Sequence, residues 1–66
     1  MTDEWRVFHF SQGNPAGPGQ GDVAALLRRV AETLDGLGEV KVHDLTFHSV
    51  PTDSGDDLTV TVYYDR

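Results

Sequence analysis

The sequence predicts an α+β fold, a three-stranded antiparallel sheet with one helix packed on one face, in the order strand, helix, strand, strand. Residues 22–36 carry apolar side chains at the period of an α-helix. Three other segments are rich in β-branched and aromatic residues and predict strands at residues 5–10, 39–50 and 58–64. Because no linker separates two cores, residues 1–66 form a single predicted domain.

The helix has predicted start and stop signals as well as an apolar stripe. Asp22 stands where an N-cap carboxylate can accept hydrogen bonds from the free N–H groups of the first turn. Gly36 and Gly38 can both adopt the left-handed conformation that ends helices. The stripe consists of Val23, Leu26, Leu27, Val30, Leu34 and Leu37.

The strand predicted at residues 39–50 changes the phase of its apolar alternation. Val40 and Val42 have one parity, whereas Leu45 and Phe47 have the other. A bulge near His43 and Asp44 would bring all four side chains to one face, because it inserts one extra residue into the strand. The alternative is a strand that is covered on both faces.

Residues 11–21, with the sequence SQGNPAGPGQG, form a predicted loop because their four glycines and two prolines exclude a helix or a central strand. A loop of this kind before a helix can bind phosphate, but Asp22 puts negative charge where phosphate would sit. The other two interpretations are a simple connector and a loop that orders against a neighbouring subunit. The sequence leaves these open. The turn between the last two strands is predicted at residues 51–57.

Composition disfavours several classes of partner. A formal net charge of -6 repels nucleic-acid phosphates and anionic membrane surfaces. No apolar run approaches the roughly 20 residues that span a bilayer, and the first residues are acidic where a secretory signal is basic. The prediction is therefore a cytoplasmic protein that binds neither nucleic acid nor membrane. A basic protein remains a possible partner, and otherwise the acidity serves solubility.

Catalytic and metal-binding constellations are not apparent. His9, His43 and His48 lack the spacing of a metal site, and the chain has no cysteine. No nucleophile stands with a base, and no pair of carboxylates is predicted to meet, so a non-enzymatic role is expected. The candidate ligand-binding residues are the aromatic side chains best suited to stack on a planar molecule: Trp5, Tyr63 and Tyr64.

The sheet is predicted to need a second source of cover. A single helix covers one face, and the reverse face would hold Thr59, Thr61 and Tyr63. It would also hold one parity class of the first strand, either Trp5, Val7 and His9 or Arg6, Phe8 and Phe10. Either class leaves large apolar side chains uncovered, at a cost of several kcal/mol, so self-association is predicted.

Several short segments resemble the dodecins, which are small strand-helix-strand-strand proteins. The similar segments are Trp5 to Phe10, Thr33 to Leu37, Glu39-Val40 and Val60 to Val62. The resemblance implies assembly into a hollow dodecamer and flavin held between aromatic side chains. Two features differ, since Leu37-Gly38 stand where dodecins have a flavin-stacking tryptophan and Thr59 stands where they have a glutamine. No flavin-binding residue is therefore transferred.

The first functional hypothesis is a non-enzymatic homo-oligomer that binds or stores a small planar ligand, such as a flavin, at its subunit interfaces. The second is a protein–protein interaction module whose acidic surface selects its partner. The third is an accessory subunit of an enzyme.

Overall fold

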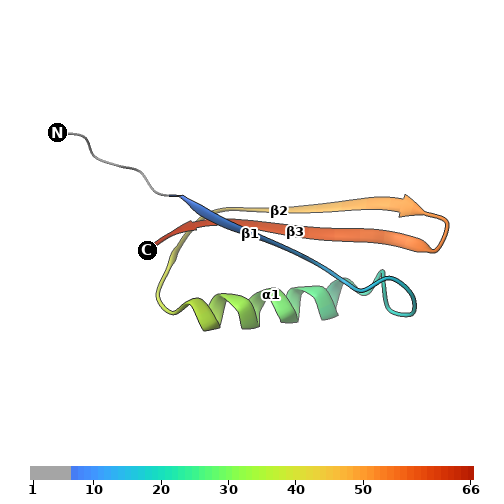
Figure 1. Ribbon diagram of the computed structural model, residues 1–66, viewed down its shortest axis with the longest axis horizontal. Coiled ribbons are helices and arrows are strands. Elements are labelled where there is room, and N and C mark those ends of the chain that lie inside the picture. The colour runs from blue at the N-terminus through green and yellow to red at the C-terminus, as the bar shows by residue number, and fades with distance from the viewer. Residues whose placement is uncertain (1–6) are drawn as a thin grey trace.

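The computed structural model describes residues 7–66 and contains one helix and one sheet within them (Figure 1). The three strands form an antiparallel sheet in the order β1-β3-β2. The elements are β1 (Phe8–Gly13), α1 (Val23–Leu37), β2 (Lys41–Thr52) and β3 (Gly55–Asp65). The predicted α+β fold, with a three-stranded antiparallel sheet and one helix, is confirmed.

Helix α1 begins and ends at the predicted signals. The Asp22 carboxylate accepts a hydrogen bond from the Ala25 N–H at 3.0 Å, as an N-cap should. Gly38 ends the helix with φ of 83°, and its N–H donates to the Asp35 carbonyl at 3.2 Å. A side chain other than glycine would be strained in that conformation, which explains why a glycine stands there.

Replacing Asp22 by alanine is expected to lower the free energy of unfolding by about 1 kcal/mol, because the Ala25 N–H loses its acceptor. Asp22→Asn is the matched control, since asparagine caps helices about as well as aspartate. Urea unfolding followed by circular dichroism measures both variants. Equal stability of the alanine and asparagine variants would show that the cap contributes nothing.

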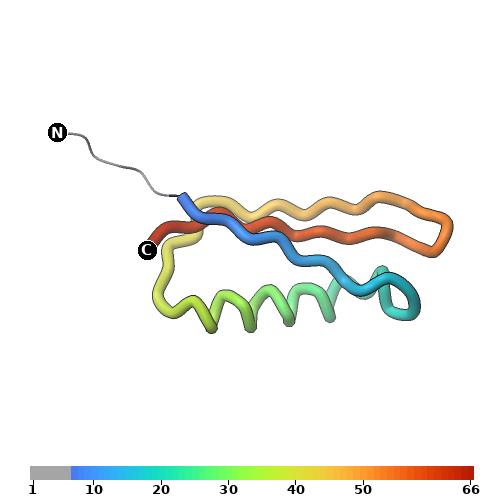
Figure 2. The backbone as a smooth tube through the Cα atoms, in the orientation of Figure 1, coloured from blue at the N-terminus to red at the C-terminus, as the bar shows by residue number. Residues whose placement is uncertain are grey.

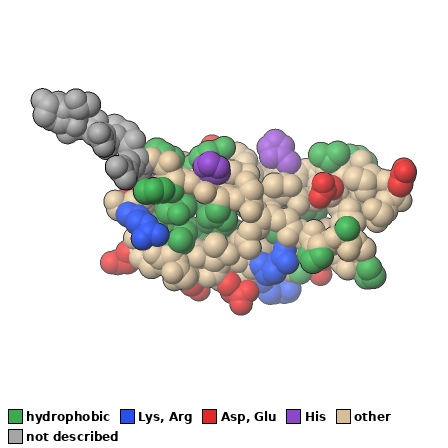
Figure 3. Space-filling model, in the orientation of Figure 1, with side chains coloured by type: hydrophobic (Ala, Val, Ile, Leu, Met, Phe, Trp, Pro, Cys, Tyr) green, Lys and Arg blue, Asp and Glu red, His purple; other side chains and the backbone are tan. Residues whose placement is uncertain are grey.

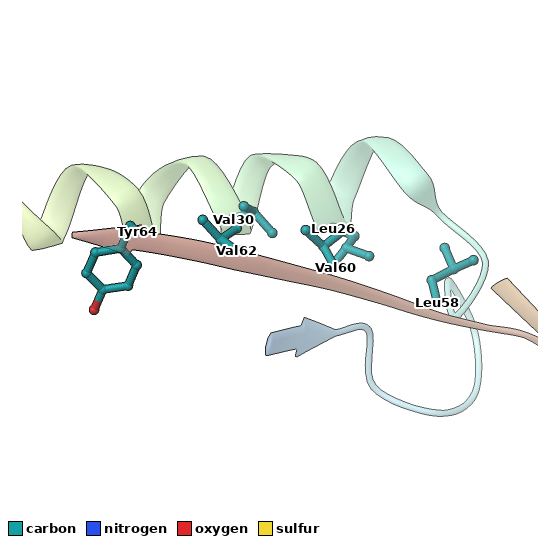
Figure 4. Packing of buried hydrophobic residues seen from close by; sticks show 6 residues of the cluster. All are labelled: Leu26, Val30, Leu58, Val60, Val62 and Tyr64. Atoms are coloured by element: carbon teal, nitrogen blue, oxygen red, sulfur yellow. The ribbon is translucent and has the colours of Figure 1, made fainter. Parts of the chain in front are cut away.

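The core lies between α1 and the central strand β3. Leu26 and Val30 of α1 point toward Val60 and Val62 of β3 (Figure 4), and all four are buried. Leu58 and Tyr64 extend this cluster along the same strand. Within the described residues, α1 packs on β3 and β1 and makes no contact with β2. The helix therefore covers only part of the sheet face on which it was predicted to pack.

The change of phase in β2 is resolved by a bulge, as predicted. The pairing register with β3 shifts between Val42 and Asp44. As a result, Val42, Leu45 and Phe47 stand opposite three buried residues of β3, namely Tyr64, Val62 and Val60. Directly paired residues share a face of the sheet, so these β2 side chains lie on the helix side.

The strand boundaries differ from those predicted, most of all at the end of β1 and at the turn between β2 and β3. β1 begins at Phe8 and continues to Gly13, and Ser11 inside it shares a 2.8 Å hydrogen bond with Thr61 across the sheet. The turn between β2 and β3 is only Asp53-Ser54, much shorter than the predicted 51–57. In both places pairing with β3 satisfies the backbone of polar residues that resemble loop residues in isolation.

The loop between β1 and α1 is held by its own side chains and by the hairpin. Asn14 donates from Nδ2 to the carbonyls of Gln20 and Asp22 at 3.0 and 2.9 Å. The buried Gln20 accepts from the Gly17 N–H at 3.1 Å and from the Ser54 hydroxyl at 3.4 Å. The loop thus lies under the tip of the β2-β3 hairpin (Figure 2).

Candidate interaction surface

The reverse face of the sheet, as far as the structure describes it, is mostly polar. Phe8 and Phe10 of β1 are paired with Tyr64 and Val62, so both lie on the helix side. The reverse side of the sheet holds mostly hydroxyl and imidazole side chains together with one exposed valine: His9, Ser11, Thr46, His48, Val50, Thr59, Thr61 and Tyr63. Of the two classes predicted for the first strand, the one that contains Phe8 and Phe10 faces the helix and the one that contains Val7 and His9 faces away, with Val7 49% exposed. Trp5 and Arg6 lie outside the described residues.

A row of uncovered apolar side chains lies on the helix side, along β2. Val42, Leu45 and Phe47 retain 42%, 46% and 46% of their surface. They share a face with the buried residues of β3, but α1 does not reach over β2. This strand therefore presents an apolar row to solvent.

The flank of α1 on the β2 side is also apolar. Arg29 and Thr33 lie on the β1 side of the helix, where Arg29 donates to the Gly13 carbonyl and Thr33 donates to Gln12 Oε1 at 2.8 Å. Each residue turns an α-helix by about 100°, so Leu27 lies about 100° from the buried Leu26, in the opposite sense from Arg29. Val23, one turn earlier, shares this flank, and the two side chains are 41% and 45% exposed.

We call the surface formed by Val23, Leu27, Val42, Leu45 and Phe47 the open face. Its exposed side-chain parts amount to roughly 400 Å² if each large apolar side chain has about 150–200 Å² in all. That area matches the largest apolar patch of a typical monomer, and such patches are often binding sites. The charged residues Arg28, Glu32 and Asp35 lie on the far side of α1 by the helical period, so the open face is free of charge.

The space-filling view in Figure 3 shows where charged and hydrophobic side chains lie on one face of the molecule. In Figure 3 the acidic side chains are scattered along the helix and at the far end of the hairpin, and hydrophobic side chains gather between the helix and the strands. Scattered acidic groups provide solubility without forming a single recognition site.

The predicted ligand-binding residues do not meet in one site. Tyr64 is buried on the helix side, where its ring centroid is 5.7 Å from that of Phe8. Tyr63 is exposed on the reverse side, 5.7 Å from the ring of His9 at an interplanar angle of 35°. Trp5 lies outside the described residues. The two tyrosines therefore cannot enclose the same planar molecule within one chain.

The open hollow between the loop and the hairpin tip is polar. It has a volume of about 290 Å³ and is lined by Asn14, Ala16, Gln20, Thr52, Ser54 and Asp57. Gln20 is already bonded to Gly17 and Ser54, so its side chain serves the loop. Sequence reasoning missed this hollow because its halves are about 30 residues apart.

The histidines do not assemble a metal site among residues 7–66, where no three His, Asp or Glu side chains are grouped to hold an ion. His43 is engaged by Asp65, with 2.6 Å between Nε2 and Oδ2. This pair joins the bulged end of β2 to the end of β3, which is a structural role. Over the same described part of the chain, the helix is too short and too polar to span a bilayer.

The fold and the open face together define a small α+β protein with an uncovered apolar surface. Comparisons with protein-family models, curated proteins and solved structures find no match to this chain.

Proposed function

We propose that the protein is a non-enzymatic homo-oligomer that assembles through the open face. The observation that carries this proposal is the apolar row of β2 on the helix side of the sheet, which α1 leaves exposed. At about 25 cal/mol per Å², covering roughly 80 Å² on each side chain contributes about 2 kcal/mol, and a two-fold pair covers ten of them, or roughly 20 kcal/mol in all. Association itself costs about 4–15 kcal/mol, so a fully covered open face gives a favourable balance and rim contacts set the net affinity.

A second copy of the chain fits the open face because that surface carries no charge. The chain has a net charge of -6, so two copies repel each other least where they meet on an uncharged surface. The open face is such a surface. A basic partner would instead need acidic side chains to recognise, and the open face has none.

The finer parts of the proposal are a dodecin-like assembly and a planar ligand at its subunit interfaces. The element order β1, α1, β2, β3 supports the first part. The tilted ring pair of Tyr63 and His9 supports the second, because exposed aromatic rings can stack on a planar molecule, here on the reverse side of the sheet from the open face. Flavin is the natural probe for that site.

Native mass spectrometry of the purified protein, together with its visible absorption spectrum, tests this function. The expected result is an oligomer whose mass falls on dilution, with an absorption band where a flavin or other chromophore is retained. A strict monomer at micromolar concentration would contradict the assembly. A monomer that copurifies with one stoichiometric protein would favour an interaction module instead.

A further inference from the structure

The free edge of β2 is nearly closed to strand addition. β2 lies at the edge of the sheet, and edge strands readily pair with strands of other molecules. Pro51 is paired with Asp56 of β3 but has no N–H to donate, so its backbone nitrogen points to the free edge. Backbone N–H groups point alternately to the two sides of a strand, so those of Ser49, Phe47 and Leu45 also point to the free edge.

The N–H of Leu45 confirms this direction and is already used. It donates to the Asp44 carboxylate at 2.9 Å, within the bulged end of the strand. From Leu45 to Pro51, only Phe47 and Ser49 therefore keep a free donor at the edge. An antiparallel strand from a second molecule would find two donors between a bulge and a proline, too few for a stable ladder.

The open face, by contrast, has the shape of a step that a second sheet fits. A helix with its side chains is about 10–12 Å across, so α1 rises by that amount above β1 and β3 and leaves β2 low beside it. Two stacked sheets lie about 10 Å apart. The β2 strand of a second copy, turned over, would therefore fill the step beside α1.

We infer that two copies associate by stacking β2 on β2, face to face in the steps beside their helices, and not by joining their β2 edges. This inference rests on the proposed assembly and defines its geometry. In a two-fold pair, Leu45 and Phe47 of one copy meet the same row of the partner, and each Leu27 flank meets the partner's β2 edge. Because the β2 edge has few free N–H groups, few hydrogen bonds to water are lost when the apolar flank of α1 covers it.

Single cysteines on the two faces of β2 distinguish the arrangements, because the chain contains no cysteine of its own. The helix-side series is Leu45→Cys, Phe47→Cys and Ser49→Cys, and the reverse-side series is Thr46→Cys, His48→Cys and Val50→Cys. Ser49 and His48 form a closely matched pair, since both are exposed and neither belongs to the core. Each variant is treated with a short bismaleimide and resolved on a denaturing gel, after circular dichroism has shown that it folds.

If the faces stack, at least one helix-side variant is expected to form crosslinked dimers. Its rate of crosslinking should be at least about tenfold higher than that of any reverse-side variant, because assembly raises the effective concentration of the paired thiols. Edge pairing about a two-fold axis would bring the residue on the axis within about 5.5 Å of its symmetry mate, and its two neighbours, which point to the opposite face, within about 10 Å of theirs. Crosslinks in both series would therefore overturn the stacked geometry and leave the assembly standing. Crosslinks on the reverse side alone, or an oligomer that crosslinks in neither series, would place the contact elsewhere. Either result would overturn the stacked geometry and the assembly through the open face. A monomer that crosslinks in neither series would also overturn these two claims.

Discussion

Replacing Phe47 by aspartate is expected to convert the assembly into a folded monomer. The side chain is 46% exposed within one chain, so its loss should cost the monomer little. Across a two-fold interface, however, the change buries two carboxylates beside Leu45 and Val42 with no partner in reach. The dissociation constant should rise at least about 100-fold, or roughly 2.7 kcal/mol, as measured by sedimentation equilibrium.

Val50→Asp is the matched control for this change. Val50 is in the same strand, is 56% exposed and lies on the reverse face opposite Asp57. The same charge there should leave the oligomeric state unchanged. If Val50→Asp dissociates the oligomer and Phe47→Asp does not, the interface is on the reverse face of the sheet.

Replacing Leu26 by alanine is expected to unfold most of the protein. Leu26 is fully buried between α1 and β3, and its truncation should cost about 2–5 kcal/mol. A core of this size seldom provides more than about 3–5 kcal/mol, so little stability would remain. Circular dichroism and urea titration at low protein concentration measure the loss.

Leu27→Ala makes the same chemical change one residue further along, on the open face. It should leave the stability of the dilute monomer nearly unchanged and weaken the assembly instead. Urea midpoints measured at several protein concentrations separate the two effects, because only the stability of an assembly depends on concentration. Equal losses in the two variants at low concentration would contradict the assignment of Leu27 to an exposed flank.

The local features of the fold were predictable from the sequence. Asp22 and Gly38 mark the ends of α1 because capping is a local interaction. The bulge near Asp44 was predictable because a change of parity in an apolar row has few structural solutions. These features depend on residues a few positions apart.

The features that depend on pairing were not predictable in the same way. Ser11 and Gln12 resemble loop residues until β3 pairs with them and Thr61 binds the Ser11 hydroxyl. The strand order, with β3 in the centre, decides that α1 rests on β1 and β3. A uniform cover over one face was the natural expectation from sequence, so the exposure of Val42, Leu45 and Phe47 on the helix side was not predicted.

The candidate surface was also predictable only in part. Apolar side chains at Val42, Leu45 and Phe47 predicted a buried strand face, and their alternation was read correctly. That this face stays open follows from the lateral position of α1, which no local pattern encodes. The aromatic residues Tyr63 and Tyr64 are adjacent, and the alternation of the strand separates them onto opposite faces.

The most direct test of the account is an isotope-filtered nuclear Overhauser experiment on a mixed sample of labelled and unlabelled chains, which detects contacts only between molecules. The account predicts intermolecular signals among the methyl groups of Val42, Leu45 and Leu27 and the ring of Phe47. Intermolecular signals confined to reverse-face residues such as Thr61 and Val50 would contradict it. A folded protein that gives no intermolecular signal at all, with residues 42–47 still accessible to solvent, would contradict it as well.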